Sequence, residues 1–487
     1  MRCLALAQAW RGAGGSTTFV MAGDMPEIER RLEGDGFNVH HLRAHPGSEM
    51  DALQTADLAH LVQAIFVVVD GYHFGAGYQM ALKKAKLHLL FIDDYGHAEF
   101  YWADLVLNQN VYAQEDLYRN RNCQTVLLLG SSYVLLRREF WPWRGWQRNN
   151  SKIAAKILIT LGGSDPDNVS LMIIKSLNDL VSRGIELLIV AGGGYAHDTE
   201  LQVALDCSKV PMRLVRNASN MPDLMAWADL AIISGGTTSY ETAFMGLPSL
   251  IVIIAENQVL VAEKLAEIGA AVNLGWHHDL TCERIKKIVE DLAGDRASRD
   301  FMSRMSRNLI DGRGSSRIIK AMLKRAISVR EAVADDGEQI FLWANDSDTR
   351  AASFNSGMIS WDGHCNWFTD RISDGNCLFL ICGEEQGHSV GVVRFDIAAD
   401  EAKVSINLDP GVRGRGWAGF IIIRAVDELF SRRGIRKVNA FIKPENLRSA
   451  RAFERAGFSR VGSCNINGNE ARHYVLTNED LASQSQF

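Results

Sequence analysis

Two short apolar runs, Leu230–Ile233 and Ser249–Ile254, enclose a segment that opens with the pair Gly235 and Gly236. Runs this apolar are typical of strands that are buried on both faces, and such strands belong to parallel sheets. The glycine pair permits a tight turn, and the segment between the runs has room for the helix that connects parallel strands. We therefore expect a strand–helix–strand unit within a doubly wound α/β fold.

The same stretch carries polar groups at the carboxyl end of each strand. Thr237 and Thr238 begin the helix, Glu241 lies in its first turns, and Asn257 and Gln258 follow the second strand. A helix N-terminus presents unpaired N–H groups and partial positive charge, which suit a diphosphate, and a nearby carboxylate can bind ribose hydroxyls. The pattern therefore predicts a nucleotide-sugar site at these strand ends.

Length and composition bound the rest of the chain. At 487 residues the chain exceeds one ordinary hydrophobic core, so two or three domains are expected. Its formal net charge of -6 suggests neither a nucleic-acid nor a membrane partner. No apolar run reaches the roughly 18 residues of a bilayer span and no signal peptide is evident, so we expect a cytoplasmic protein. The 8 cysteines form no C-x-x-C pair, which argues against a metal site.

Alternating strands and helices predict two similar lobes, residues 1–145 and 151–328, joined by the aromatic and polar link Trp141–Asn150. Two such lobes facing each other across a cleft make the architecture called GT-B. Because ligands gather at the carboxyl ends of parallel strands, Asp70 and Tyr72 are expected at the mouth of the cleft. Asp93 and Asp94 follow another strand and are candidates for metal binding, acid–base chemistry or helix capping, with capping expected for at least one of them.

A second glycine turn, Gly162–Asp165, follows the first strand of the second lobe and opens a helix. Alone it is as consistent with a tight turn as with a ligand loop. Paired with the turn at Gly235, it favours a ligand loop in which Gly163 and Ser164 contact a phosphate or a uracil edge.

The remaining part, residues 338–482, differs in kind. Successive strands at Leu378–Cys382, Ser389–Asp396 and Lys403–Leu408 predict an antiparallel meander, and helices Gly419–Arg433 and Leu447–Ala456 complete an α+β domain. The charged stretch Glu331–Glu338 is interpreted as the linker to it, and the polar tail after Leu481 as disordered.

A family resemblance spans residues 1–330 and rests on several segments taken together. They are Arg2–Ala7, Asp70–Tyr72, Ile92–Asp94, Leu105–Asn108, Leu135–Phe140, Gly162–Asp165 and Ser234–Gln258. As a set they resemble the UDP-2,4-diacetamido-2,4,6-trideoxy-β-L-altropyranose hydrolase of pseudaminic acid biosynthesis. More distantly they resemble the GT-B transferase that adds N-acetylglucosamine to lipid I.

The resemblance implies an inverting cleavage of UDP from the sugar, with water attacking the anomeric carbon. It implies that Glu241 holds the ribose and that the turn from Gly235 to Thr238 holds the diphosphate. It implies that Asn257 and Gln258 contact the sugar or a phosphate, with Tyr72 and Asp70 at the reacting centre.

The N-terminus departs from the family pattern. The family carries a Gly-x-Gly-His-x-x-Arg motif whose histidine is the proposed general base, and its arginine, a substrate-binding residue, corresponds to Arg2. The histidine would then lie upstream of Met1. Either the true product begins one strand earlier, or the chain binds nucleotide sugars without hydrolysing them. His73 and His97 are interpreted as loop histidines rather than as replacements.

The last part carries a second resemblance. Arg413, Gly414, Gly416 and Ala418 follow a strand and open a helix, and they resemble the acyl-CoA loop of the GNAT superfamily of N-acetyltransferases. Small residues there let backbone N–H groups approach a pyrophosphate. Asn446-x-x-Ser449-x-x-x-Phe453-x-x-x-Gly457-Phe458 matches that family's second signature. The resemblance implies acetyl-CoA as co-substrate and a cofactor site that includes Asn446 and Ser449.

The front of this part, from Trp343 to Phe368, resembles the substrate half of sugar N-acetyltransferases, including the one that acts just before the hydrolase. Many members use a tyrosine as the acid where this chain has Phe453, so that acid is absent or replaced, with Tyr474 or a water as candidates. His364 is a candidate base, although a structural role is the favoured interpretation.

Together these features predict a bifunctional enzyme that N-acetylates the 4-amino group of a UDP-linked amino sugar and then hydrolyses the product, with no metal. Two alternatives remain. One is a GT-B glycosyltransferase with an acceptor other than water, and the other is a lobe pair that binds nucleotide sugars without turnover beside an active acetyltransferase.

Overall fold

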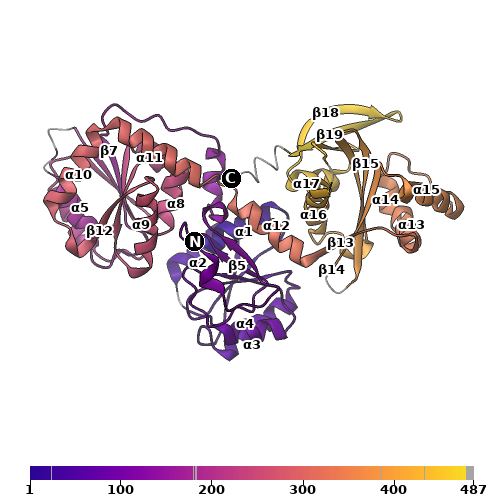
Figure 1. Ribbon diagram of the computed structural model, residues 1–487, viewed down its shortest axis with the longest axis horizontal. Helices are drawn as coiled ribbons and strands as arrows, with labels where there is room; N and C mark the ends of the chain where they lie inside the picture. The colour runs from indigo at the N-terminus through magenta and orange to yellow at the C-terminus, as the bar shows by residue number, and fades with distance from the viewer. Residues whose placement is uncertain (24, 179, 181–183, 385–386, 433, 479–487) are drawn as a thin grey trace.

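The computed structural model describes residues 1–23, 25–178, 180, 184–384, 387–432 and 434–478. Three bodies follow one another along the chain, and Figure 1 shows the second lobe on the left, the first lobe below and the last domain on the right. The polar tail after Leu481 lies outside the described residues. The expected fold class is confirmed in a doubly wound α/β second lobe and a mixed α+β last domain, whereas the first lobe is α/β but not doubly wound.

The second lobe is a parallel sheet with helices on both faces (Figure 1). Its strands are β7 (Lys156–Thr160), β8 (Glu186–Ala191), β9 (Met212–Arg216), β10 (Leu230–Ser234), β11 (Ser249–Ile253) and β12 (Val272–Trp276). Its helices are α5 (Val169–Leu177), α6 (Asp198–Asp206), α7 (Met221–Trp227), α8 (Thr237–Phe244), α9 (Val259–Glu267), α10 (Cys282–Gly294) and α11 (Arg296–Leu309). Strands β10 and β11 are buried along their whole length, as the two apolar runs predict.

The strand order of this sheet is β12-β11-β10-β7-β8-β9. From β7 the chain winds outward through β8 and β9, and from β10 it winds in the other direction through β11 and β12. The order therefore reverses between β7 and β10, which are hydrogen-bonded neighbours. Ligands of doubly wound folds bind outside the carboxyl ends of the strands at such a switch point. The turns at Gly162 and Gly235 follow these two strands.

The first lobe contains two separate parallel sheets, β1-β2 and β3-β4-β5-β6. The strands are β1 (Thr18–Met21), β2 (Asn38–His41), β3 (Val67–Asp70), β4 (Leu89–Ile92), β5 (Leu105–Asn108) and β6 (Val126–Leu129). The helices are α1 (Arg2–Gly12), α2 (Pro26–Gly34), α3 (Glu49–Leu61) and α4 (Ala76–Lys84). The ends of β3, β4 and β5 bring Asp70, Asp94 and Asn110 to one edge of the lobe.

The link between the lobes is fixed to the second lobe by Arg148. Its guanidinium donates to the backbone oxygens of Met225 (2.6 Å), Ala228 (2.6 Å) and Met245 (3.2 Å). Burial lowers the pKa of Arg148 to about 10. These three bonds satisfy carbonyls at the ends of α7 and α8, which is why a polar link can pack there.

The last domain begins earlier than residue 338. Strand β13 (Ile327–Glu331) pairs antiparallel with β14 (Cys377–Glu384) and forms the edge of the domain's sheet. The expected linker Glu331–Glu338 is therefore short and structured: Glu331 ends the strand, Ala334–Asp336 form a 3-10 helix, and α13 begins at Gly337. Helix α12 (Gly314–Ala326) leads directly into β13.

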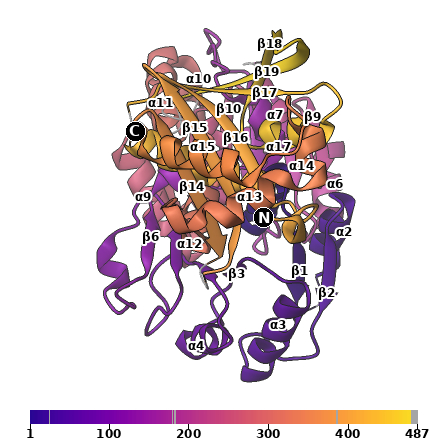
Figure 2. The same cartoon turned by 90° about the vertical axis from the view of Figure 1, so that its right-hand side faces the viewer.

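The sheet of the last domain has the order β13-β14-β15-β16-β17-β19-β18 and lies between two helical layers. The remaining strands are β15 (Ser389–Ala398), β16 (Glu401–Leu408), β17 (Lys437–Ile442), β18 (Ser459–Ile466) and β19 (Asn469–Thr477). Its helices are α13 (Gly337–Asn345), α14 (Ser347–Ala352), α15 (Trp361–Ser373), α16 (Trp417–Arg432) and α17 (Leu447–Arg455). Helices α13, α14 and α15 lie on the outer face (Figures 1 and 2), and α16 and α17 lie toward the first lobe.

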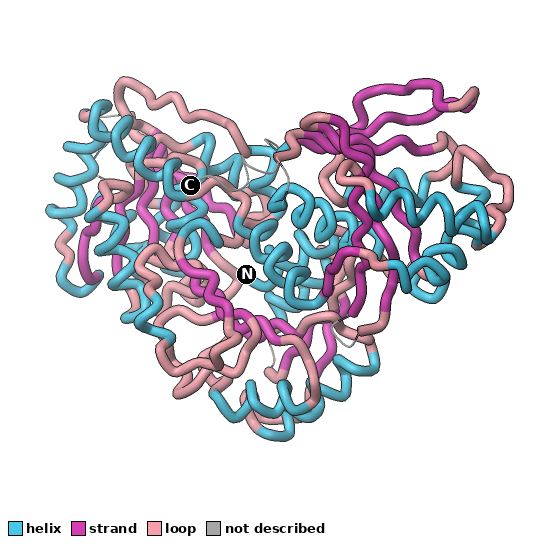
Figure 3. Tube along the Cα trace, turned by 45° about the vertical axis from the view of Figure 1, so that its right-hand side comes forward, coloured by secondary structure: helices cyan, strands magenta, loops and turns pink. Residues whose placement is uncertain are grey.

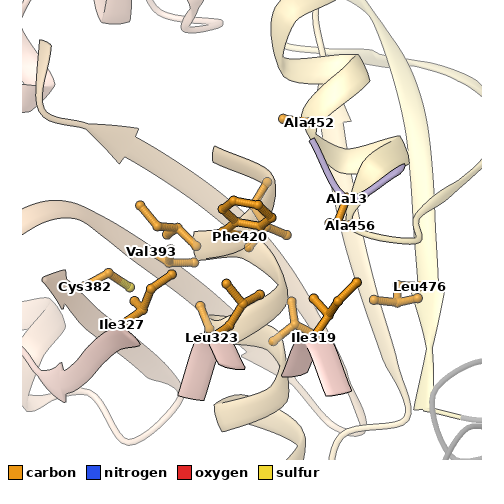
Figure 4. Close-up of a cluster of buried hydrophobic side chains, with 14 of the residues drawn as sticks. Ala13, Ile319, Leu323, Ile327, Cys382, Val393, Phe420, Ala452, Ala456 and Leu476 are labelled. Atoms are coloured by element: carbon orange, nitrogen blue, oxygen red, sulfur yellow. The ribbon is translucent and has the colours of Figure 1, made fainter. Parts of the chain in front are cut away.

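The first lobe and the last domain share one hydrophobic core. Helix α1 packs between them, and the ring centroids of Trp10 and Phe420 are 4.4 Å apart. Figure 4 shows Ala13 beside Ala452 and Ala456 of the last domain. Ile319 and Leu323 of α12 belong to the same cluster. The tube view in Figure 3 shows how helices fill the space between the two bodies.

Two further features bear on function. No helix among the described residues is long and apolar enough to cross a membrane. Within the same residues, no group of three or more His, Cys, Asp and Glu side chains is arranged to hold a metal ion.

Candidate functional site

A cluster of charged side chains lies where the strands of the first lobe end. Arg2 donates to Asp70 Oδ1 at 2.7 Å and to Asp94 Oδ1 at 2.5 Å. Burial disfavours the charged form of Arg2, but the two carboxylates outweigh it and raise the pKa of Arg2 above its ordinary value. The predicted residues Arg2 and Asp70 therefore meet, and Asp94 joins them through an ion pair that spans two strand ends.

Tyr72 links this cluster to the second lobe. Its hydroxyl donates to Asp94 Oδ2 at 2.7 Å and accepts from Asn257 Nδ2 at 3.4 Å. Burial and the hydrogen bond to Asp94 raise the pKa of Tyr72 to about 12, so this phenol stays protonated at neutral pH. Tyr72 is 46% exposed, which leaves its ring accessible to a ligand between the lobes. Three of the residues predicted at the reacting centre thus lie together.

A second connection between the lobes runs through Asn110, which the sequence did not single out. Its Nδ2 donates to Asp94 Oδ1 at 2.8 Å, and its Oδ1 accepts from the hydroxyl of Tyr240 at 3.0 Å. Tyr240 lies on α8 and also contacts the backbone N–H of Val111. Asn110 follows β5 and therefore lies at the same sheet edge as Asp70. This position in the sequence is the signal that could have identified Asn110.

The two helices that start at the switch point differ at their N-termini. Asp165 caps α5, because its carboxylate accepts from the N–H groups of Val169 and Ser170 at 2.9 Å each. These amides are therefore not available to a phosphate. Gly163 and Ser164 precede the cap and are exposed. The loop after β8 packs closely against this turn, since the N–H of Gly194 donates to the backbone oxygen of Gly163.

Helix α8 begins at Thr237 after Gly236, and no side chain caps it. The N–H of Gly235 is bonded to Gln258 Oε1 at 3.2 Å, and that oxygen also accepts from Ile254. Gln258 therefore ties the ends of β10 and β11 together. The N-terminus of α8 has the unpaired amides and the dipole that favour an anion.

Glu241 is buried and paired with an arginine. It is 6% exposed, and its Oε1 accepts two hydrogen bonds from Arg137, at 3.1 and 2.8 Å. Burial raises the pKa of Glu241, although Arg137 opposes that shift. This pair joins α8 to the segment before the link between the lobes, and the contact of Glu241 with a ribose stays a prediction.

Asp93 and His97 form a buried pair behind the cluster. His97 Nδ1 lies 3.0 Å from Asp93 Oδ1, and Tyr101 donates to the other oxygen of Asp93. Asp93 also accepts from the N–H groups of Asp94 and Tyr95. The capping role expected for one of the two aspartates thus fits Asp93, and the structural interpretation of His97 fits its contacts.

This pair predicts a pH-dependent stability. The hydrogen bond to Asp93 raises the pKa of His97 above its usual 6.5. The resulting stabilisation is fully present below pH 6.5 and is lost as the pH rises through the raised pKa. Burial raises the pKa of Asp93, but hydrogen bonds from His97 and Tyr101 outweigh it, so the contribution of Asp93 is lost only in more acidic solution. The substitution His97→Gln should therefore destabilise the protein more at pH ~5.5 than at pH ~8.5 in urea unfolding.

The matched control for this prediction is His278→Gln, since His278 is an exposed histidine of the second lobe. Its substitution should change the free energy of unfolding little at either pH. An equal loss of stability at both pH values for His97→Gln would contradict the charged pair.

In the last domain, strands β16 and β17 separate at one end. They pair in parallel only over Glu401–Lys403 and Lys437–Asn439. Beyond this point β16 continues to Leu408 paired with β15 alone. The opening lies directly before the loop that holds Arg413 and leads into α16, so an extended chain can enter between the two strands there.

The loop itself is held by Arg413. Its guanidinium bonds to Asp346, to Thr349 Oγ1 at 3.0 Å and to the oxygen of Leu408 at 3.0 Å. The Arg413 side chain therefore shapes the loop, and a pyrophosphate would meet the loop's backbone instead. Gly414 and Gly416 have φ of +78° and +84°, and Ala418 lies in the first turn of α16.

The second signature also forms a cap. Asn446 Oδ1 accepts from the N–H of Ser449 at 3.1 Å at the start of α17. Phe453 is buried against Phe458, with ring centroids 5.0 Å apart. Tyr474 is 1% exposed and bonds to Glu454 at 3.1 Å. Phe453 has no hydroxyl, and the hydroxyl of Tyr474 is bonded to Glu454. Neither residue therefore offers a free hydroxyl at the opening between β16 and β17.

Gly416 touches the first lobe. A Cβ at Gly416 would lie 2.6 Å from the backbone oxygen of Gly14, whereas a Cβ at Gly414 would meet nothing within 4 Å. Both positions have positive φ, so alanine costs roughly 1 kcal/mol of strain at each. We expect Gly416→Ala to lower the urea midpoint clearly more than the matched Gly414→Ala, because it also displaces α1. Equal midpoints for the two variants would contradict this contact.

Comparison with known proteins supports this division of the chain. Residues 157–320 match the family model described as the glycosyltransferase family 28 C-terminal domain, and residues 327–459 match the model described as the acetyltransferase (GNAT) domain. The second match begins at the first residue of β13, as the sheet does. The mixed fold thus combines a glycosyltransferase-like lobe with a GNAT domain.

Two curated proteins are similar over long stretches. An uncharacterized protein of Methanocaldococcus jannaschii is 23% identical over 415 residues, which cover 81% of each chain. The spore coat polysaccharide biosynthesis protein SpsG of Bacillus subtilis is 25% identical over 244 residues, which cover 49% of this chain and 70% of that protein.

Solved acetyltransferases are similar to the last domain. An aminoglycoside acetyltransferase AAC(6')-Ib in complex with coenzyme A is 16% identical and covers 32% of this chain and 98% of its own, with a TM-score of 0.30. Spermidine N-acetyltransferase from Vibrio cholerae in complex with CoA and spermine is 20% identical, with the same coverages of 32% and 98% and a TM-score of 0.30. By the two family models, the chain joins a region similar to the glycosyltransferase family 28 C-terminal domain with an acetyltransferase (GNAT) domain.

Proposed function

We propose that this chain is a bifunctional enzyme of sugar biosynthesis that acts on a UDP-linked amino sugar. The last domain transfers an acetyl group from acetyl-CoA to the 4-amino group, and the lobe pair then hydrolyses the UDP-diacetamido sugar to free sugar and UDP. The observation that carries the hydrolytic half is the meeting of Arg2, Asp70 and Tyr72 with Asn257 across the lobes, beside the uncapped start of α8.

The hydrolysis uses groups from both lobes. The N–H groups at the start of α8 bind the diphosphate and stabilise the charge that develops on the leaving UDP. Tyr72 stays protonated and donates to Asp94, so its oxygen is left to accept a hydrogen bond from a sugar hydroxyl. Asp70 accepts the proton of the attacking water while Arg2 orients its carboxylate. The C–O bond of the sugar breaks as the water oxygen bonds to the anomeric carbon.

The acetyl transfer takes place where β16 and β17 separate. The backbone of the loop from Gly414 to Ala418 binds the pyrophosphate, and the acyl arm lies between the strands. The neutral substrate amine attacks the thioester carbon, the C–N bond forms and the C–S bond breaks, and the proton lost from the nitrogen passes through solvent to the thiolate, which leaves as free thiol. A thiolate is a good leaving group, so the reaction proceeds with Phe453 in the position where many relatives carry a tyrosine.

Free thiol measures the first activity. Purified protein with acetyl-CoA and a UDP-linked 4-amino sugar should release one thiol for each amide formed. The control omits the amino sugar and reports acetyl-CoA hydrolysis. No thiol above that control would overturn the acetylation half.

UDP measures the second activity. The protein should release UDP from the diacetamido sugar nucleotide in buffer without any added acceptor. UDP release that depends on an added acceptor would instead indicate glycosyl transfer. Tight UDP binding without turnover would indicate a binding role for the lobe pair.

A further inference from the structure

The last domain contains a cavity of about 370 Å³ beneath α13 and α15. Ser405 and Asn407 of β16 line it, and these residues directly precede the loop that leads into α16. An acyl group held at the opening between β16 and β17 therefore faces this cavity. Its volume lies at the lower end of the ~300–1,000 Å³ typical of ligand pockets, which suits one substituted sugar ring rather than a whole nucleotide sugar.

The walls of the cavity are largely apolar. Ile340, Trp367, Phe379 and Val392 line it. An indole ring such as that of Trp367 presents a flat apolar surface. Its π-face carries partial negative charge, which attracts the C–H groups of a sugar ring. A ring with methyl substituents fits such walls better than one with hydroxyl groups at every carbon, because each hydroxyl would need a buried partner.

Two buried polar atoms in the cavity wall lack a partner among the described residues. His364 is 1% exposed, and its Nε2 lies 2.8 Å from the oxygen of Gly337. That bond makes Nε2 the donor and leaves Nδ1 as an acceptor, and Nδ1 has no hydrogen bond. Burial lowers the pKa of His364, so the ring is neutral. The second atom is Arg394 Nε, a donor that likewise has no hydrogen bond.

The two orphan groups flank the same side chain. Arg394 lies over the Trp367 ring, with its guanidinium carbon 5.4 Å from the centroid, and the centroids of His364 and Trp367 are 5.8 Å apart. One free acceptor and one free donor beside an aromatic wall match the N–H and C=O of an acetamido group. A buried polar atom without a partner is unfavourable, so a ligand that satisfies both gains affinity.

The charge of the cavity wall is positive. Arg350 and Arg394 line it, and among the described residues no aspartate or glutamate does. Arg350 donates to the backbone oxygens of Ala344, Asn355 and Gly357 and takes part in no ion pair of the described chain. Arg394 pairs with Asp396 at 3.0 Å, but Arg371 also approaches Asp396, at 3.8 Å. A polycation would enter this cavity without a carboxylate to meet it.

We propose that this cavity is the acceptor pocket of the acetyl transfer and that it selects a sugar ring bearing one amine and an acetamido group while it excludes polycationic amines. The proposal rests on the acetyltransferase activity proposed above. Arg394 is then a specificity-determining residue, because its charge repels a second ammonium group and its Nε binds the amide oxygen.

The test compares three acceptors with the full-length protein and acetyl-CoA: a UDP-linked 4-amino sugar with an acetamido group, spermidine and kanamycin. Thiol release should give a kcat/KM for the amino sugar on the order of 100-fold above either polyamine, because like charges brought together cost several kcal/mol. Comparable or higher kcat/KM values for spermidine or kanamycin would overturn the pocket assignment and leave the acetyltransferase standing. No thiol with any amine would overturn the proposed activity itself.

Variants of Arg394 sharpen the test. Arg394→Glu should lower the preference for the amino sugar over spermidine at least about tenfold, since it reverses the charge in the wall. The milder Arg394→Gln should raise KM for the amino sugar and leave KM for acetyl-CoA unchanged. Arg460→Glu, at an exposed arginine on β18, is the matched control and should keep the wild-type preference. An unchanged preference in Arg394→Glu with an unchanged KM for acetyl-CoA would contradict the proposal.

Discussion

The substitution Asp70→Asn should lower the rate of UDP release by about 10²–10⁴-fold while acetyl transfer continues at the wild-type rate. Asp70 is the carboxylate that Arg2 holds at 2.7 Å, at the end of β3. An amide keeps the size of the carboxylate and one acceptor oxygen for Arg2 but cannot take a proton from water. Parallel assays of UDP and of free thiol on the same preparation separate the two effects.

Asp116→Asn is the matched control for this substitution. Asp116 belongs to the first lobe as well, and its side chain is 71% exposed in an ion pair with Arg119. Exposed pairs of this kind contribute little, so this variant should release UDP at the wild-type rate. Wild-type UDP release by Asp70→Asn would show that another group activates the water.

The substitution Trp10→Ala should lower the free energy of unfolding by about 3–5 kcal/mol. Trp10 is 9% exposed and packs on Phe420, so its removal leaves a cavity between α1 and the last domain. Because these residues belong to one hydrophobic cluster, the first lobe and the last domain should unfold together. Acetyl transfer should therefore be lost at a lower temperature, although Trp10 lies far along the chain from the acetyltransferase residues.

Leu61→Ala controls for the loss of a large apolar side chain in the first lobe. Leu61 is 80% exposed, and its substitution should change stability by less than about 0.5 kcal/mol. Thermal unfolding followed by circular dichroism, with residual acetyl transfer after heating, checks both variants. If acetyl transfer in Trp10→Ala survived heating as in the wild type, the two bodies would be independent.

The second lobe was the most predictable part of the fold. The expected strand Leu230–Ile233 corresponds to β10, which ends at Ser234, and Ser249–Ile254 corresponds to β11, which ends at Ile253. Such strands are buried on both faces, so apolar side chains must fill every position and the sequence shows them directly. The glycine turns then fix where the strands end.

The contacts between distant segments could not be predicted in the same way. The pairing of Arg137 with Glu241 joins residues that are separated by 104 positions, and no local pattern encodes it. Tyr240 and Asn110 are ordinary side chains in sequence and become partners only when the lobes meet. The early start of the last domain was hidden because β13 is an edge strand with exposed charged residues.

The candidate site was partly predictable for the same reason. Asp70 and Tyr72 stand at the end of β3 and Asn257 follows β11, so the rule for parallel strands places them at the edges of two sheets, which face each other across the lobes. The capping of α5 by Asp165 was not evident, because a Gly-Gly-Ser-Asp turn is compatible with both an open and a capped helix N-terminus.

The most direct test of a two-step enzyme is UDP release from the UDP-linked 4-amino sugar with and without acetyl-CoA. With acetyl-CoA present, UDP should appear after a lag during which the acetylated sugar nucleotide accumulates, and without acetyl-CoA it should appear far more slowly. Equal UDP release in the two reactions would contradict a sequence in which acetylation prepares the substrate for hydrolysis.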